Sequence, residues 1–304
     1  MILVAVAVIL ATGAGLAYER RSANASQAAA VILRGMLYAL VPFVSYVNIA
    51  HLRVTVGAGV GIGLAWAMIG ILAGLAYLVG RRLLALPRPE LGAVICTVVI
   101  VNTGYLGLPM AVALLGSRSL GAAVAYDQLV SGPVLFTVGF GVGATFGMRA
   151  AGGPLRRVRT FLTRNPPLIG VVAGLLATPA LAPAPLPAIS HGLVAALMIL
   201  GFFVVGILLA SERREDGAPL LERPDRRVAA AVALRMAAGP AILGVLSLLL
   251  VRMPSAYLLQ AAMPCGINSL LVGHAYGLDQ RLTATIIVWS TMIGLAGGLL
   301  LSAL

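Results

Sequence analysis

Long apolar runs alternate with short polar segments along the whole chain. A helix that crosses the hydrocarbon core of a bilayer needs about 20 mostly apolar residues. By this measure the pattern predicts ten membrane-spanning helices, at residues 1–17, 29–48, 55–80, 91–115, 120–148, 165–182, 188–210, 228–251, 255–276 and 283–303. We therefore expect an all-α integral membrane protein.

Two of the ten runs contain residues that do not suit a continuous helix. Residues 102–109 place Asn, two Gly and Pro within the run 91–115, and residues 264–269 place Pro, Gly, Asn and Ser within the run 255–276. A helix break releases backbone polar groups, which are costly in hydrocarbon, so it is tolerated only where protein buries it or where it lines a water-filled cavity. Two breaks at corresponding positions of two halves indicate the binding site of a transporter.

The arginines indicate how the helices are oriented. With the N-terminus outside the cytoplasm, 17 of the 21 Arg fall on the cytoplasmic side, and only Arg53, Arg118 and Arg252 fall on the other. Short cytoplasmic loops of membrane proteins carry such an excess of basic residues. We therefore expect both termini on the extracytoplasmic side. The remaining arginine, Arg235, lies within the run 228–251.

Ten helices divide into two sets of five, and each break falls in the fourth helix of its set. Because five is odd, the second set enters the membrane in the opposite orientation to the first, which makes an inverted repeat. We predict one repeat at residues 1–148, a basic cytoplasmic linker at 149–164 and the inverted repeat at 165–304. Helices 4 and 9 are then the broken, crossover helices of the two repeats.

The composition excludes several classes of protein. The chain is 61% hydrophobic and 10% charged, whereas a soluble domain is about half apolar and about a quarter charged. The net charge of +12 comes from Arg in short loops, which indicates contact with anionic lipid head groups and no nucleic-acid partner. Cys96 and Cys265 lie in separate apolar runs, and no Cys/His cluster has metal-ligand spacing, so we predict no metal and no cofactor.

The two breaks favour a binding site for a small anion. Proline lacks a backbone donor and glycine lets the chain unwind, so each break ends one half-helix and begins another. Pro109 suits the first turn of its half-helix, and Asn268 or Ser269 is expected to cap the other. The N-terminal end of a helix offers free N–H groups and a positive dipole, which attract an anion without a cationic side chain.

Both breaks also resemble the signatures of a known family. Residues 102–109 are similar to the fourth-helix signature of the auxin efflux carrier family, and residues 264–268, followed by 276–279, resemble its ninth-helix signature. The resemblance implies an elevator-type carrier whose transport domain moves against a scaffold domain, with the broken helices crossing at the substrate. It also implies a small organic anion as substrate, such as a dicarboxylate or an auxin-like carboxylate, and a homodimer in the bacterial inner membrane. The fold is similar to that of the bile acid–sodium symporters.

The predicted substrate site draws on both breaks. Its Asn, Thr and Ser side chains supply neutral hydrogen-bonding groups, and its Gly and Pro residues shape the backbone. Cys265 lies inside the second break, and nothing in the sequence indicates that it acts as a nucleophile. The site residues are Asn102, Thr103, Gly104, Tyr105, Gly107, Pro109, Pro264, Cys265, Gly266, Asn268 and Ser269.

Few titratable residues lie inside the predicted helices, and such residues are functional candidates by default. Asp127 and His274 are candidates for coupling transport to H⁺ or Na⁺. Each also has a structural interpretation, Asp127 as a partner of a neighbouring helix or a head-group residue, and His274 as an interfacial residue. Arg235 lies about two turns from the cytoplasmic end of its run, which favours snorkelling of its guanidinium to the membrane surface. Its functional alternative is attraction of the anion on the inward side.

Other functions remain open alternatives on this sequence. A sodium-coupled symporter for bile-acid-like or other organic solutes would use the same breaks, and a channel or facilitator for a neutral solute would need an open pore. An intramembrane enzyme would need a clustered acid, base and nucleophile, whereas Asp127, Arg235 and His274 fall on different predicted helices. The sequence contains no nucleotide-binding loop, so nothing in it indicates an ATP-driven pump. We therefore predict a secondary active transporter and no enzyme.

Overall fold

The computed structural model describes residues 1–51, 55–148, 166–177, 181–183, 185–216 and 223–303. Within these residues every regular element is a helix, apart from one isolated β-bridge. The predicted linker 149–164 lies outside the described residues.

The helices follow one another with short connections. In the first half they are α1 (Ile2–Arg21), α2 (Ala25–Gly35), α3 (Val41–Ala50), α4 (Val56–Leu78), α5 (Arg88–Val99), α6 (Leu108–Leu115), α7 (Leu120–Tyr126), α8 (Gly132–Val134) and α9 (Phe140–Phe146). In the second half they are α11 (Pro166–Leu176), α12 (Pro185–Asp216), α13 (Arg226–Ala233), α14 (Gly239–Leu249), α15 (Ser255–Ala261), α16 (Asn268–Tyr276) and α17 (Gln280–Leu301). Several are continued by π-helical turns, namely η1 (Met36–Leu40), η2 (Val79–Leu83), η3 (Thr103–Gly107), η5 (Asp127–Ser131), η6 (Leu135–Gly139) and η8 (Leu234–Ala238), and η4 (Ser117–Ser119) is a 3₁₀ turn.

Seven helical segments of the described chain are long and apolar enough to cross a membrane, which makes this a multi-pass membrane protein. They are Ile2–Arg21, Ala25–Ala50, Val56–Leu83, Ser117–Phe146, Pro185–Ser211, Arg226–Leu249 and Gln280–Leu301. The other three predicted spans contain only shorter helices. The spans 91–115 and 255–276 are each divided at a break, and the described part of the span 165–182 contains the short helix α11. The count of ten spans therefore stays a prediction.

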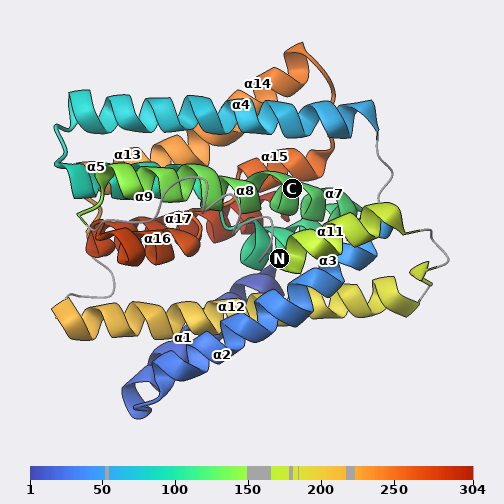
Figure 1. The fold of residues 1–304 in the computed structure, drawn as a ribbon, viewed down its shortest axis with the longest axis horizontal. Helices are drawn as coiled ribbons and strands as arrows, with labels where there is room; N and C mark the ends of the chain where they lie inside the picture. Colours follow the sequence, from blue (N-terminus) through green and yellow to red (C-terminus); the bar gives the residue numbers. More distant parts are fainter. Residues whose placement is uncertain (52–54, 149–165, 178–180, 184, 217–222, 304) are drawn as a thin grey trace.

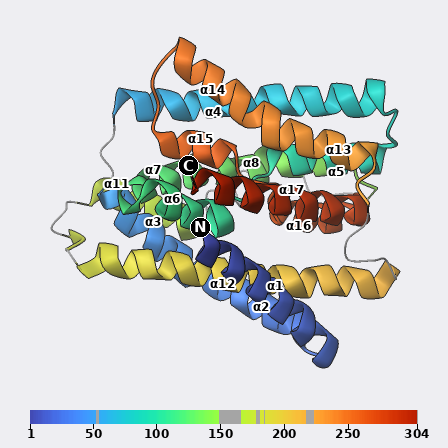
Figure 2. The ribbon, with the colours of Figure 1, turned by 180° about the vertical axis from the view of Figure 1, so that it is seen from behind.

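The long helices run roughly side by side, as Figure 1 shows. α4 and α14 lie along one side of the molecule, α12 lies along the opposite side with α1 and α2, and α5, α9, α16 and α17 lie between them. Figure 2 shows the same order from behind. Met68 of α4, Val94 of α5 and Ile286 of α17 belong to one buried apolar cluster, which places the core in the middle layer.

Glycines set the close packing of α1 against α12. A Cβ on Gly15 would collide with the carbonyl oxygen of Phe203 and would lie 3.0 Å from the Cα of Gly206. Gly13, also on α1, has nothing within 4 Å of the place where its Cβ would stand. The two helix backbones can approach this closely because Gly15 carries no side chain.

Candidate functional site

The two helix breaks lie against each other in the interior of the protein. Residues 100–102 separate α5 from η3, and residues 262–267 separate α15 from α16. Within them, Val101 and Cys265 form the isolated antiparallel β-bridge. Both of these residues are buried.

Two backbone hydrogen bonds join the breaks. The N–H of Asn102 donates to the carbonyl of Pro264 at 2.9 Å, and the N–H of Gly266 donates to the carbonyl of Ile100 at 2.7 Å. A buried backbone N–H needs a partner, and here each break supplies one for the other. The breaks therefore form one unit.

Glycines let the backbone chains approach at this point. A Cβ on Gly266 would stand 2.9 Å from the carbonyl oxygen of Val101, which is closer than real Cβ atoms come to a neighbour. A Cβ on Gly107 would collide with the side-chain oxygen of Gln260. Gly104 is less constrained, because its nearest neighbour, an oxygen of Asp127, would be at 3.5 Å.

The half-helices after the breaks begin in different ways. Pro109 is the second residue of α6, and α6 continues the π-helical turn η3 within one apolar helix, Thr103–Leu115. The predicted side-chain cap at α16 is wrong, because Asn268 is already the first residue of the helix and Ile267 precedes it without a side-chain hydrogen bond. The Oγ of Ser269 donates instead to the carbonyl of Gly266 at 2.5 Å.

The asparagines of the two breaks keep their side-chain amides available. Asn102 is 3% exposed, and its Nδ2 finds no hydrogen-bond partner among the described residues. Asn268 is half-buried at the start of α16, and its side chain likewise makes no hydrogen bond to a described residue. A buried amide without a partner costs about 1–3 kcal/mol, so a ligand that accepts a hydrogen bond is favoured there.

Asp127 lies beside the first break. The hydroxyl of Thr103 donates a hydrogen bond to Oδ1 of Asp127, and Nε2 of Gln128 donates to Oδ2 at 2.6 Å. Thr103 belongs to the predicted site and is fully buried. Asp127 therefore bonds to another helical segment, as its structural interpretation as a partner of a neighbouring helix predicted.

Gln260 is a residue of this region that the sequence pattern did not single out. It is fully buried in α15, and its Nε2 donates to the carbonyl of Thr103 at 3.4 Å and to that of Ala123 at 3.3 Å. Its Oε1 has no partner among the described residues. The available signal was an uncharged amide in an apolar run four residues before Pro264.

Arg235 does not snorkel, and that interpretation is wrong. Its side chain is fully buried and donates to the carbonyl of Val98 at 3.2 Å and to the carbonyl of Ala261. Val98 is in the last turn of α5 and Ala261 is the last residue of α15. Carbonyls at the C-terminal end of a helix lack the usual N–H partners, so they hold the guanidinium inside the protein.

The other predicted residues, Tyr105, Cys265 and His274, lie in different surroundings. Tyr105 is half-buried in η3 and lies against Gly201 of α12, where a Cβ would stand 2.8 Å from its ring. The N–H of Cys265 donates to Oγ of Ser290 at 3.2 Å. His274 is exposed in the last turn of α16, away from the bridge itself. The structure thus brings Asp127, but not His274, to the breaks.

Three polar residues of this region occur in π-helical turns. Thr103 begins η3, Asp127 begins η5, and Arg235 is the second residue of η8. A π-helical turn inserts an extra residue and redirects side chains, and such turns are frequent at functional sites. The three turns therefore reorient these side chains away from regular helical positions.

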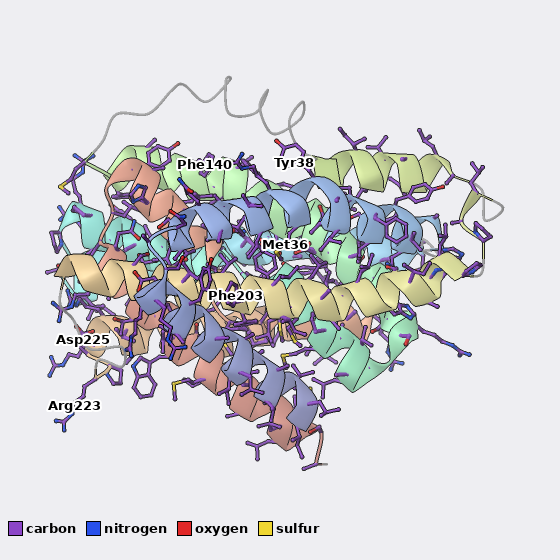
Figure 3. The ribbon with its side chains drawn as sticks, turned by 90° about the horizontal axis from the view of Figure 1, so that it is seen from below. Met36, Tyr38, Phe140, Phe203, Arg223 and Asp225 are labelled. Atoms are coloured by element: carbon purple, nitrogen blue, oxygen red, sulfur yellow. The ribbon has the colours of Figure 1, made fainter. Side chains whose placement is uncertain are left out.

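A separate pocket of about 380 Å³ lies where α13 and α17 begin. Figure 3 shows two residues of its lining, Arg223 and Asp225, at one end of the molecule. Burial raises the pKa of Asp225, but hydrogen bonds from the Val228 N–H and from Arg227, with the charge of Arg227, lower that pKa more, to below its ordinary value. Arg227 also pairs with Glu90 at 2.8 Å, so much of the charge around the pocket is compensated locally.

The comparisons with known proteins match parts of the chain. Residues 158–297 match a family described as "Membrane transport protein". A protein described as an uncharacterized transporter, from Methanocaldococcus jannaschii, is 30% identical over 102 residues, which are 34% of this chain and 32% of that protein. The match thus spans about a third of the relative's length.

Paired breaks within a multi-pass helical protein, together with these matches, support the class of membrane transport proteins. Both matches agree with the resemblance to the auxin efflux carrier family that the two break motifs carry.

Proposed function

We propose that the protein is a secondary active transporter of a small organic anion, such as a dicarboxylate or an auxin-like carboxylate. The observation that carries this proposal is the pair of breaks, joined by the Val101–Cys265 bridge, with the side-chain amide of Asn102 buried and unpartnered among the described residues. The half-helices that follow present positive N-terminal ends and amide donors to the same place. A carboxylate accepts from both.

Asp127 supports coupling to a cation. An ionised carboxylate bonded to Thr103 repels a substrate anion held at the same break. A proton or Na⁺ bound at Asp127 removes that repulsion, so anion and cation bind together. We therefore propose H⁺ or Na⁺ as the coupling ion and Asp127 as its site.

The packing of the helices supports two inverted repeats. α1 packs on α12, and the segment of α2 and α3 packs on α11, which is the same contact with the halves exchanged. α5 packs on α17, and α15, the counterpart of α5, packs on α7 in the same exchanged manner. The proposal therefore retains ten spans, with repeats at 1–148 and 165–304, in the inner membrane with both termini outside the cytoplasm.

The layered arrangement supports an elevator-type movement. α1, α2, α3, α11 and α12 lie together along one side in Figure 1, and the helices that carry the breaks lie beside them. At the boundary, Tyr105 of η3 lies against Gly201 of α12. Because Gly201 has no side chain, the ring of Tyr105 can move past it. We therefore propose that α1, α2, α3, α11 and α12 form the scaffold and the homodimer contact. The helices that carry the breaks form the moving body.

Thermal unfolding of the purified protein tests the proposal. We would measure the melting temperature with a panel of mono- and dicarboxylates at two pH values, with and without Na⁺, because a ligand of the folded state raises it. Stabilisation by a carboxylate that depends on pH or Na⁺ is the expected result. Counterflow in proteoliposomes then separates a carrier, which exchanges substrate, from an open channel.

Absence of stabilisation by every carboxylate would overturn the anion site. Stabilisation without counterflow would overturn the carrier mechanism and favour a channel. A neutral amide of each acid serves as the control for effects that do not depend on charge.

A further inference from the structure

Four helix ends meet at the paired breaks, and their dipoles oppose one another. α5 and α15 end there, whereas η3 with α6, and α16, begin there. A helix end carries roughly half an elementary charge, positive at the N-terminus and negative at the C-terminus. The four ends therefore sum to about zero, and alone they give little preference for an anion over a neutral solute.

At the two negative ends, the carbonyls of Val98 and Ala261 lack their helical N–H partners. In a continuous helix the carbonyl of Val98 would accept from the N–H of Asn102, but that N–H donates to Pro264. The carbonyl of Ala261 would accept from the N–H of Cys265, but that N–H donates to Ser290. Both carbonyls thus lose their helical partners to the bridge and its surroundings.

The guanidinium of Arg235 donates hydrogen bonds to both of these carbonyls. It reaches them from η8, in a third part of the chain, and it is fully buried. It forms no ion pair with a described residue, and its Nε has no partner among them. Its positive charge is therefore balanced by the two helix ends and by no carboxylate of its own.

We propose that Arg235 determines the preference of the site for anions, an inference that rests on the proposed function. Its charge cancels the two C-terminal ends, so that the two N-terminal ends dominate at the breaks. Arg235 contacts backbone carbonyls and not the substrate, so it acts as a positioning and charge-setting residue. Asp127, which is bonded to Thr103 of the first break, is the opposing charge of the site, and its coupling ion neutralises it when the anion binds.

The test compares malonate with malonamide, which has a similar size and no charge. We would measure the apparent affinity of each from thermal stabilisation of the wild type, Arg235→Gln, Arg235→Lys and Arg226→Gln. Arg226 is an exposed residue at the start of α13 and provides the matched control. The charge of Lys replaces that of Arg, whereas Gln removes it.

We expect Arg235→Gln to weaken malonate binding about tenfold relative to malonamide, the effect of a unit charge at roughly 10 Å in an effective dielectric of about 20. Arg235→Lys and Arg226→Gln should keep the wild-type ratio. A purely structural role would weaken both ligands alike, so an unchanged ratio in Arg235→Gln overturns the inference. If Arg235→Gln does not fold, Arg235→Lys decides, because loss of the preference in a variant that keeps the charge also overturns it.

The failure of the proposed function gives a different result. A folded wild type that binds neither malonate nor any carboxylate of the panel overturns the anion site, and this inference with it. A wild type that binds a carboxylate, with the same ratio in all variants, overturns only the role of Arg235.

Discussion

The backbone N–H of Asn102 donates a hydrogen bond to the carbonyl of Pro264 at 2.9 Å, although the two residues belong to different halves of the chain. This bond satisfies the backbone of Asn102, while its side-chain Nδ2 stays buried without a partner among the described residues. The main chain is thus fixed by the other break, and the side chain is available to a ligand. The division of roles makes Asn102 the clearest position for a substitution.

Asn102→Ala and Asn268→Ala are each expected to abolish uptake and the stabilisation by carboxylates. Each change removes a side-chain amide at the paired breaks without removing a hydrogen bond to a described residue. Both variants should therefore fold in detergent with nearly the wild-type melting temperature, measured beside uptake in proteoliposomes.

Asn48→Ala is the matched control for these variants. Asn48 is buried away from the breaks, and its Nδ2 donates to Oγ of Ser190 at 2.6 Å. This variant should lose about 1–3 kcal/mol of stability and still respond to the ligand. Full uptake by both Asn102→Ala and Asn268→Ala would contradict a site at the breaks.

Asp127→Asn is expected to remove the dependence of uptake on the driving ion. An amide neither titrates nor carries a negative charge, while it can still accept from Thr103. Uptake would be measured at two pH values with and without Na⁺. Asp225→Asn, at the exposed start of α13, should keep the wild-type ion response. An unchanged response in Asp127→Asn would exclude Asp127 from coupling.

Gly107→Ala is expected to cost about 1–3 kcal/mol, because the added methyl group collides with Gln260. Gln260 cannot move without losing its bonds to the carbonyls of Thr103 and Ala123, so uptake should fall as well. Gly104→Ala, in the same π-helical turn, meets its nearest neighbour at 3.5 Å and should cost less. Equal melting temperatures for the two variants would contradict the close approach at Gly107.

Gly15→Ala is expected to separate α1 from α12 and to destabilise the protein by about 1–3 kcal/mol. Its Cβ would collide with the carbonyl oxygen of Phe203, part of the backbone, which cannot rotate away. Gly13→Ala on the same helix adds its methyl group to open space, so it should change stability by less than about 1 kcal/mol. Thermal unfolding in detergent compares the two, and the reverse order would be evidence against this packing.

Asp225→Ala is expected to cost about 0.5–2 kcal/mol near neutral pH, because Asp225 caps α13 by accepting from the N–H groups of Arg227 and Val228. The lowered pKa of Asp225 means that its charged form stabilises the fold above the ordinary carboxyl pKa. That contribution is lost as the pH falls through the lower, folded-state pKa. Unfolding measured across this acidic range should show the two proteins converging, whereas a constant difference would exclude a role for the charge.

The positions of the breaks could be predicted because their causes are local. Pro264 cannot donate to a helical hydrogen-bond ladder, and it lies just after the helix end at Ala261. Gly104, Gly107 and Pro109 mark the first break only approximately, because all three lie within the helix Thr103–Leu115 that follows it. The side-chain cap predicted at Asn268 is absent, so the first residue of a helix follows less closely from the sequence.

The environment of Arg235 and Gln260 could not be predicted in the same way. Both side chains bond to backbone groups of distant segments, so their partners depend on how the breaks pack and not on neighbouring residues. Distance from a predicted helix end indicated snorkelling for Arg235, but the bare carbonyls of Val98 and Ala261 offer acceptors inside the protein. The π-helical turns at Thr103, Asp127 and Arg235 likewise have no residue pattern that marks them.

The antiparallel bridge between Val101 and Cys265 looks the same from either of its strands, because a two-fold axis exchanges the two partners of such a pair. A single half of the chain contains only one of these strands, so alone it has a broken helix whose central N–H groups face nothing. The bridge thus makes each half of the chain supply backbone hydrogen-bond partners to the break of the other half.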